Sequence, residues 1–385
     1  MAIINGTAGA DILNGTTSND TITGSGGNDT IVGDTGIDTA GFAGNAADYQ
    51  LSGTVAGQTV KLNVKDINLL DGNEGTDTLQ NIEYIKFSDR VWQVFPSRFL
   101  VNSTTGGDQI NSTVTALVDG GFVVTWVASG SGYGQRYNSA GTMEGNEFLI
   151  SNSVGGDWLN NFQGAYSLNP ITVTAMADGG FVATWQSSDY GIYAQRYSST
   201  GIPVSNKFLI STYVTNGTTR HDENPTITAL NDGGFVVAWQ FEYLGANSGI
   251  YGRRFNSAGN AVGNEFVISE SNQLPNPSIT ALNDGGFVVT WQSGDVNGYG
   301  IYGQRYDASG VATGVKFRAN TYWSSNQISS VVTALTDGGF VVVWTSDKQD
   351  GQGGGIYGQR YDSTGSSVGE EFRINTTTTN DQSEP

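Results

Sequence analysis

Four aspartates at one spacing form the pattern in this sequence that most clearly indicates chemistry. Asp11, Asp20, Asp29 and Asp38 lie nine residues apart, and each ends a six-residue turn that begins with glycine. Carboxylates repeated among the carbonyl groups of tight turns supply the hard oxygen ligands that Ca²⁺ prefers. The pattern therefore predicts that residues 6–41 bind calcium, whereas the alternative is an Asp- and Gly-rich loop without metal.

Glycine begins every one of these turns and occupies the fourth position of all but the second, where Ser18 stands instead. We expect these glycines to allow positive φ angles, so that the turns close with their carbonyls pointing inward. They are Gly6, Gly9, Gly15, Gly24, Gly27, Gly33 and Gly36. A short strand with an apolar middle residue follows each turn. Two nonapeptides then form one coil, which stacks Asp11 over Asp29 and Asp20 over Asp38, with two or three Ca²⁺ between the turns.

This pattern resembles the nonapeptide repeat of the RTX family. The resemblance implies a parallel β-roll that folds around Ca²⁺, and export by a type I route in which the roll folds outside the cell. The segment Met1–Gly6 lacks the basic and apolar regions of a secretory signal, so no N-terminal signal peptide is expected. RTX segments usually lie toward the C-terminus, whereas here the roll comes first.

Residues 42–98 lack the nonapeptide pattern and complete the first predicted domain, residues 1–98. Alternating residues at 49–53 and 60–64 predict two strands. The acidic segment 71–89 resembles the cap that often follows RTX repeats. Its Asp71, Glu74 and Asp77 are candidates for an additional calcium site, with a solvated acidic turn as the alternative.

Residues 99–385 contain five copies of one pattern, Asp-Gly-Gly-Phe-Val followed by an apolar run that ends in tryptophan. The tryptophans are Trp126, Trp185, Trp239, Trp291 and Trp344. Each copy contains four predicted strands, and four-stranded units of this length are typical of β-propeller blades. The sequence therefore predicts an all-β protein in which an RTX-type roll precedes a five-bladed propeller, with an open repeat array as the alternative. A further short strand around Phe99 makes six such phenylalanine strands, which suggests a shared edge or additional repeats.

In the strand Phe287–Trp291, alternation places Phe287, Val289 and Trp291 on one face and Val288 and Thr290 on the other. Both faces are largely apolar, so we expect neighbouring blades to cover both. One arginine also recurs in every repeat, and we interpret it as a partner for the aspartate of the Asp-Gly-Gly turn. The arginines are Arg136, Arg196, Arg254, Arg305 and Arg360.

Residues that differ among the repeats are the better candidates for recognition, because periodic residues usually serve the repeat itself. Aromatic side chains in the variable loops suggest a surface that stacks on sugar rings. These candidates for glycan binding are Trp158, Tyr190, Tyr243, Tyr299 and Trp323.

Composition excludes several classes of protein. The formal net charge of −19 argues against nucleic-acid binding, which needs a basic surface. Cysteine is absent and the single histidine, His221, is placed in a polar loop, so neither a thiolate site nor a multi-histidine zinc site is expected. No apolar run is long enough for a membrane span.

These observations predict a secreted or cell-surface protein that binds calcium and has a structural or adhesive role. Surface glycans and other copies of the same chain are its expected partners, in addition to calcium itself. A lectin is the main alternative, and a carbohydrate-active enzyme is less favoured, so no catalytic residue is predicted.

Overall fold

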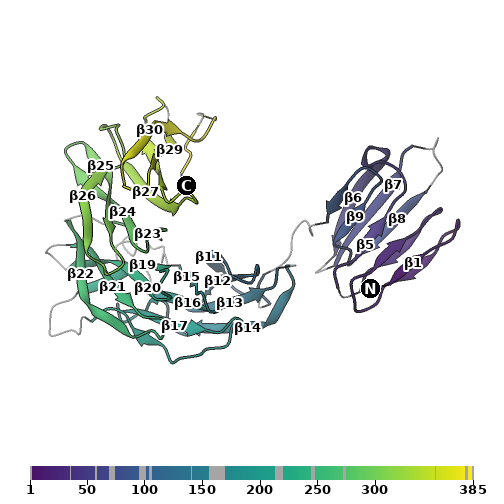
Figure 1. Ribbon diagram of the computed structural model, residues 1–385, viewed down its shortest axis with the longest axis horizontal. Helices are drawn as coiled ribbons and strands as arrows, with labels where there is room; N and C mark the ends of the chain where they lie inside the picture. The colour runs from purple at the N-terminus through teal and green to yellow at the C-terminus, as the bar shows by residue number, and fades with distance from the viewer. Residues whose placement is uncertain are drawn as a thin grey trace. The chain divides into compact units, whose positions relative to one another are not determined.

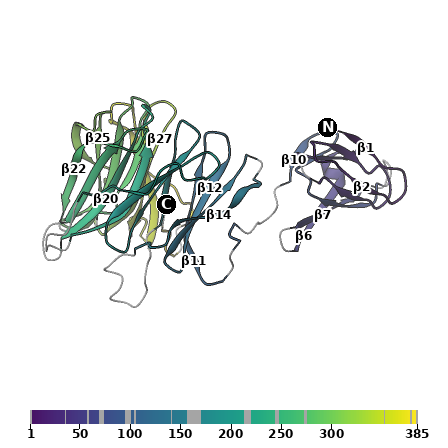
Figure 2. The same cartoon turned by 90° about the horizontal axis from the view of Figure 1, so that it is seen from below.

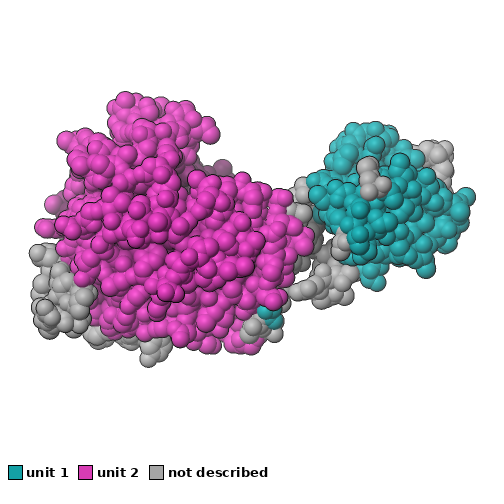
Figure 3. Space-filling model, turned by 60° about the horizontal axis from the view of Figure 1, so that its bottom comes forward, with its two compact units in different colours: residues 1–103 teal, residues 104–385 magenta. Residues whose placement is uncertain are grey.

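The computed structural model divides the chain into two compact units, residues 1–103 and 104–385 (Figure 3). Nearly all of its regular structure is β-strand, which confirms the predicted all-β class, with one short 3-10 helix, η1 (Ala46–Asp48). No helix in the described chain is both long and apolar enough to cross a membrane. The structure describes all residues except 1, 35, 57–58, 69–73, 95–100, 104–105, 140, 156–169, 213–219, 244–247, 272–274, 352, 378–379 and 384–385.

Unit 1 is a roll made of two five-stranded sheets (Figure 1). The first sheet has the order β1 (Ile3–Asn5), β3 (Thr21–Thr23), β5 (Thr39–Gly41), β9 (Tyr84–Lys86) and β10 (Val91–Gln93). The second has the order β2 (Ile12–Asn14), β4 (Thr30–Val32), β8 (Thr76–Gln80), β7 (Thr59–Asp66) and β6 (Tyr49–Ala56). Consecutive nonapeptides alternate between the two sheets, as predicted.

The parallel strands of the roll are in register at intervals of two nonapeptides. Ile4 pairs with Ile22 and Ile22 with Ala40, while Leu13 pairs with Ile31. Strand β8 then continues the second sheet in parallel from β4, and β9 continues the first from β5. The segment after the repeats therefore forms a third coil of the same roll, and its middle residues join Ile22 and Ile31 in the buried core.

Unit 2 consists of five four-stranded antiparallel sheets, which we number as blades 1 to 5 (Figures 1 and 2). Blade 1 contains β11 (Gln109–Ala116), β12 (Phe122–Ala128), β13 (Ser131–Tyr137) and β14 (Met143–Ser151). Blade 2 contains β15 (Thr172–Ala175), β16 (Phe181–Gln186), β17 (Ile192–Tyr197) and β18 (Phe208–Leu209). Blade 3 contains β19 (Arg220–Ala229), β20 (Phe235–Tyr243), β21 (Ser248–Phe255) and β22 (Ala261–Ser271). Blade 4 contains β23 (Ser278–Ala281), β24 (Phe287–Asp295), β25 (Gly298–Tyr306) and β26 (Ala312–Arg318). Blade 5 contains β27 (Gln327–Ala334), β28 (Phe340–Asp347), β29 (Gly354–Tyr361) and β30 (Ser367–Arg373).

The Asp-Gly-Gly motif makes the turn between the first two strands of each blade. In blade 4, Gly285 has a φ of +87°, a conformation that a residue with a Cβ rarely adopts. The Asp284 carboxylate accepts a hydrogen bond of 2.9 Å from the Gly286 amide, which fixes the turn. Because β23 and β24 then pair in antiparallel register, the motif positions the inner half of the blade.

The second strand of a blade is covered on both faces, as its alternation predicts. Phe287, Val289 and Trp291 pack with buried residues of blade 3, whereas Val288 packs with those of blade 5. All five repeat tryptophans are buried. The cores of unit 2 therefore lie between blades, and each blade depends on its neighbours.

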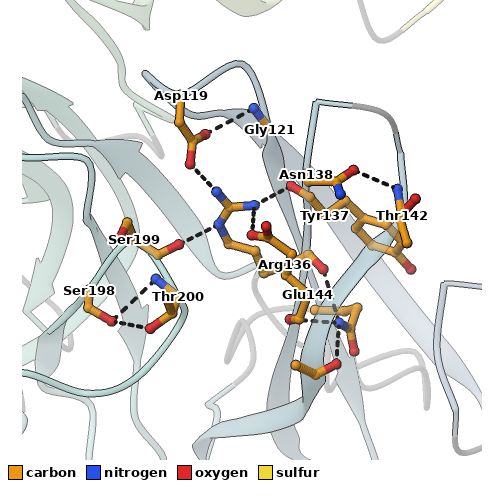
Figure 4. Close-up of polar contacts among 12 residues, drawn as sticks. Asp119, Gly121, Arg136, Tyr137, Asn138, Thr142, Glu144, Ser198, Ser199 and Thr200 are labelled. Atoms are coloured by element: carbon orange, nitrogen blue, oxygen red, sulfur yellow. Dashed lines mark hydrogen bonds and ion pairs between the residues drawn. The ribbon is translucent and has the colours of Figure 1, made fainter. Parts of the chain in front are cut away.

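The recurrent arginine pairs with the aspartate of its own Asp-Gly-Gly turn in all five blades, as predicted. In blade 1, Arg136 contacts Asp119 and Glu144, and its Nε donates a 2.5 Å hydrogen bond to the Ser199 carbonyl of blade 2 (Figure 4). Arg136 thus links the Asp-Gly-Gly turn and the fourth strand of its own blade to the next blade. The additional phenylalanine strand around Phe99 begins outside the described residues.

We expect Ile301→Ala to destabilise unit 2 by about 2–5 kcal/mol, because Ile301 is fully buried between blades 4 and 5 and its loss leaves a cavity. Ile202→Ala is the matched control, since that side chain is 63% exposed, and it should change stability by less than about 0.5 kcal/mol. Urea unfolding followed by tryptophan fluorescence compares the two. Equal midpoints would contradict this assignment of the core.

Candidate calcium-binding turns

The first two turns of the roll are closed by their own aspartates. The Asp11 Oδ2 atom accepts hydrogen bonds from the Thr7 amide at 2.6 Å and from its hydroxyl at 2.9 Å. The Asp20 Oδ2 atom accepts the same pair from Thr16, at 2.6 and 2.7 Å. In the last two turns the second position adopts a positive φ instead, +72° at Ser25 and +74° at Asp34.

The aspartates are connected from coil to coil by their backbone amides, which confirms the predicted stacking. The Asp11 amide donates to Asp29 Oδ1 at 2.8 Å, and the Asp20 amide donates to Asp38 Oδ1 at 2.7 Å. The third coil continues both series, because the Asp29 amide donates to Asp77 Oδ1 at 2.8 Å. The Asp38 amide donates to Glu83 Oε2 at 2.7 Å. The roll therefore carries two carboxylate columns, Asp11–Asp29–Asp77 and Asp20–Asp38–Glu83.

Glu83 was not among the sequence-predicted ligands, because no glycine-rich turn of the nonapeptide type precedes it. Its position nevertheless carries a signal. Each aspartate of the four repeats directly precedes the first residue of its short strand, and Glu83 directly precedes β9 in the same way. Its position immediately before a short strand with an apolar middle residue is the signal that would have identified Glu83 as a candidate.

The glycines are required mainly because the turns approach one another closely. A Cβ atom on Gly6 would lie 2.4 Å from the Gly24 carbonyl oxygen, and one on Gly15 would lie 2.2 Å from that of Gly33. A Cβ on Gly24 would lie 2.2 Å from the Asp29 Oδ2 atom. Carbonyl and carboxylate oxygens therefore line the narrow space between stacked turns.

The expectation of positive φ at both glycine positions is wrong for the first position. Of the seven predicted glycines, only Gly27 and Gly36 have positive φ, at +106° and +138°. The first glycine of each turn is selected by crowding rather than by its backbone angles. The crowding is against the next coil at Gly6, Gly15 and Gly33, and against the Asp29 side chain of the same turn at Gly24. At Gly9 neither crowding nor a positive φ requires glycine, since a Cβ there would contact only Thr7 Oγ1, at 3.9 Å.

The columns contain oxygen atoms that fit a cation. The Oδ2 atoms of Asp29 and Asp38 are buried and have no hydrogen-bond partner among the described residues. Burial, together with the nearby carboxylates of Asp29 and Glu74, raises the pKa of Asp77 to about 7. Burial and the Asp38 carboxylate likewise raise the pKa of Glu83. A hard cation between the turns would offset this accumulated negative charge.

Most of the oxygen ligands for such a cation would come from the main chain. Within the described ranges, no three acidic or histidine side chains gather at one point. The carbonyls of stacked turns, such as Gly24 and Gly33, lie beside the aspartate columns. This donor set of carbonyl and carboxylate oxygens is one that suits Ca²⁺.

Two of the three acidic candidates that follow the repeats lie in the described residues, and they have different partners. Asp77 belongs to the first carboxylate column. Glu74 instead accepts hydrogen bonds from the Tyr49 hydroxyl and from the Ala43 amide, the latter at 3.3 Å. Asp71 lies outside the described residues.

The aromatic candidates in unit 2 have different environments. Trp323 is 56% exposed, with the Arg318 guanidinium 3.5 Å from the centre of its ring. Tyr190 is stacked on His221 with ring centres 4.0 Å apart, and Tyr299 is half-buried in β25. Tyr243 ends β20, and Trp158 lies outside the described residues. Trp323 is therefore the candidate with the most accessible ring among those whose side chains are described.

The prediction that His221 lies in a polar loop is wrong, because it lies in β19 and is buried. Burial lowers the pKa of its imidazole. The adjacent Asp222 is also buried and forms a 2.6 Å ion pair with Arg220. Four consecutive polar residues resemble a loop in sequence, but here they pair with β20 in a sheet, and the Tyr190 ring stacks on His221.

Comparison with known proteins agrees with this geometry. Residues 5–40 match the model of the RTX calcium-binding nonapeptide repeat, in four copies. The first part of the chain carries RTX repeats. No curated protein matches the chain in sequence.

Solved structures similar to the chain are distant. The Dos1 propeller has 10% identity and a TM-score of 0.43 over 87% of this chain and 73% of its own. The SapL1 lectin in complex with alpha methyl fucoside has 12% identity and a TM-score of 0.40 over 84% of this chain and 94% of its own. A thermostable family-43 glycoside hydrolase has 10% identity and a TM-score of 0.40 over 74% and 98%. The propeller assignment therefore depends on the five blades described above.

Without calcium, we expect unit 1 to lose stability as pH rises from about 4 to about 7. The folded pKa of Asp77 is raised from 3.8 to about 7, so its contribution is complete below the unfolded pKa and is lost as pH rises through the folded value. Asp77→Asn should flatten this dependence, because the amide cannot ionise. Thermal melts in a chelator across this pH range measure it, and an unchanged slope in the variant would contradict the assignment.

Proposed function

We propose that unit 1 is a calcium-dependent folding module of a secreted or cell-surface protein with a structural or adhesive role. The observation that carries this proposal is the pair of buried, unpartnered Oδ2 atoms of Asp29 and Asp38 within matched RTX turns. Their columns end at Asp77 and Glu83, so we propose these two residues as ligands beside the repeat aspartates. The carbonyls of the stacked glycines complete the donor set.

The physical basis is the coupling of binding to folding. Bringing six carboxylates into two columns costs free energy through desolvation and mutual repulsion, and the unfolded chain avoids that cost. Calcium that binds the stacked turns but not the unfolded chain stabilises the roll by a free energy that rises with the logarithm of the calcium concentration once it exceeds the dissociation constant. The roll would thus stay unfolded where calcium is scarce and fold where it is plentiful. This behaviour suits export through a type I route, as the RTX resemblance implies.

For unit 2 we propose binding rather than catalysis. Each recurrent arginine forms an ion pair with the aspartate of its turn, and the tryptophans are buried in the cores between blades. Buried Asp222 is paired with Arg220. The loops and exposed edges differ from blade to blade, and they are the surfaces we propose for ligand binding.

A glycan-binding role is the second candidate, and the exposure of Trp323 favours it. The Arg318 guanidinium covers one face of the Trp323 indole and is itself paired with Asp295, so the exposed remainder of the ring is the surface offered to a sugar. Tyr190 contributes less, since its ring is engaged with His221.

We expect calcium to raise the melting temperature of unit 1 and to increase its β-sheet signal in circular dichroism. The double variant Asp29→Asn, Asp38→Asn should bind calcium at least about tenfold more weakly, which is about 1.4 kcal/mol. Asp34→Asn is the matched control, because that side chain is exposed in the same turn and asparagine tolerates its positive φ. Calorimetric titration with Ca²⁺ measures the affinities. Unchanged spectra and melting curves after chelation would refute the proposal.

If unit 2 binds glycans, a glycan array should show saturable binding that Trp323→Ala reduces at least about tenfold, through loss of the stacking face. Trp323→Phe retains an aromatic ring and should keep most of the binding. Tyr190→Phe, which keeps the ring stacked on His221, is expected to bind like the unmodified chain. The absence of saturable binding, or equal binding by all variants, would remove this candidate.

A further inference from the structure

Two asparagine–glycine bonds lie in the roll, each at the point where a short strand ends and a calcium-binding turn begins. Asn5 ends β1 and precedes Gly6, and Asn14 ends β2 and precedes Gly15. Asparagine followed by glycine deamidates more readily than other dipeptides, because glycine leaves the main chain flexible and its amide nitrogen unhindered. The first two turns of the roll are therefore each preceded by a reactive bond.

Deamidation needs a free glycine amide and a main chain that can bend. The amide nitrogen loses its proton and attacks the side-chain carbonyl carbon of asparagine, which forms a cyclic succinimide and releases ammonia. Water then opens the succinimide at either carbonyl, to give aspartate or isoaspartate. In isoaspartate the main chain passes through the side chain and is one carbon longer. The reaction consumes only water, so no oxidant, metal or enzyme has to be supplied.

The folded roll holds both glycine amides in hydrogen bonds to the next coil. The Gly6 amide donates to the Thr23 carbonyl at 2.8 Å, and the Gly15 amide donates to the Val32 carbonyl at 2.7 Å. The asparagines before them pair with the same two residues in the parallel sheets. A hydrogen-bonded amide is a poor nucleophile, and a paired strand cannot bend to bring it onto the side-chain carbonyl. The folded main chain therefore blocks the reaction.

The asparagine side chains have no such protection. Asn5 and Asn14 are both exposed, so water reaches their amide groups in the folded roll. Only the hydrogen bonds and strand pairing of the main chain then separate the reactants. Unfolding of the roll removes both restraints together, because both are contacts with the next coil.

From this geometry we propose that Asn5 and Asn14 are deamidation sites that the folded roll protects and that react when the roll unfolds. The rate of modification follows the fraction of molecules in which the roll is open. The link to calcium rests on the proposed function, in which calcium keeps unit 1 folded. A chain that remains without calcium then accumulates aspartate or isoaspartate ahead of its first two turns.

The isoaspartate product disrupts the stacking of the turns. Its additional main-chain carbon lies directly before Gly6 or Gly15, where a Cβ on the glycine would lie 2.4 or 2.2 Å from a carbonyl oxygen of the next coil. The threonine after each glycine donates its amide to the aspartate that closes the turn. A longer main chain displaces both contacts, since the space between coils is already filled. Modification thus makes a reversible loss of calcium permanent.

Peptide mapping by mass spectrometry tests the proposal on the full chain, held at mildly alkaline pH with Ca²⁺, with a chelator, or in guanidinium chloride. Asn5 and Asn14 should deamidate at least about tenfold faster in the chelator and in guanidinium chloride than with Ca²⁺, which corresponds to about 1.4 kcal/mol of opening free energy. Asn297, which precedes Gly298 in an exposed turn of unit 2, is the internal reference. Its rate should be equal with Ca²⁺ and with chelator. The fourth Asn-Gly pair begins at Asn216, outside the described residues.

Circular dichroism of the same samples separates this proposal from the calcium proposal. If the chelator leaves the roll folded, the calcium proposal fails, and the comparison between guanidinium chloride and native buffer still decides whether folding protects the asparagines. Equal rates at Asn5 and Asn14 in the folded and unfolded samples overturn the modification proposal.

A double variant, Asn5→Gln and Asn14→Gln, tests the structural consequence. Glutamine keeps an exposed amide at both positions but forms a cyclic imide far more slowly, because the ring is larger. After a long unfolded incubation and return to Ca²⁺, the variant should regain its β-sheet signal, whereas the unmodified chain should lose signal in proportion to its isoaspartate content. Equal recovery by the two chains, with isoaspartate present in the unmodified one, overturns the permanent effect.

Discussion

The structure of unit 2 depends on a strand that is apolar on both faces and therefore must be covered twice. A strand with one apolar face can form a sheet that is solvated on its other side, but Phe287–Trp291 cannot. Its two faces are buried against blades 3 and 5, so each blade supplies half of two cores and contains no complete core of its own. The arginine that joins the turns of a blade follows the same rule, since in blade 1 it also bonds to blade 2. Stability in such an array accumulates from neighbour to neighbour.

Unit 1 depends on an analogous constraint, but the quantity shared between neighbouring coils is charge as well as apolar surface. Each coil adds two apolar middle residues, one from each of its strands, to the core and two carboxylates to the columns. Every added coil stabilises the roll through its apolar core, whereas its carboxylates destabilise the roll unless a cation is present. The same stacking that builds the roll thus creates its need for calcium. Metal binding and folding are consequently one event in our proposal.

The periodic parts of both units could be predicted from the sequence, because a repeated residue has a repeated physical reason. The stacking of Asp11 on Asp29, the burial of the tryptophans and the pairing of Arg305 with Asp284 all follow from spacing and polarity. The non-periodic parts could not be predicted in this way. Glu83 reaches its column from a segment without the glycine pattern, and His221 lies in a strand that pairs with β20, with Tyr190 stacked on its ring. The role of the first glycine in each turn was also missed, since crowding against the next coil or against the turn's own aspartate is a property of the folded roll.

The roll of unit 1 and the blades of unit 2 end in different ways. In unit 1 the third coil departs from the repeat, yet it supplies Asp77 and Glu83 to the columns, and its strands β8 and β9 pair with the antiparallel strands β7 and β10. That segment closes one end of the roll with residues specific to it. In unit 2 the segment after blade 5 instead repeats an interior contact, because Asn375 Nδ2 donates to Gln382 Oε1 at 3.0 Å, as Asn320 Nδ2 donates to Gln327 Oε1 at 2.8 Å after blade 4. The end of the roll is thus built from residues that the nonapeptides lack, whereas the last blade keeps the polar contacts of the blades before it. The same residues recur in unit 2 because each blade presents the same edge to the chain that follows it.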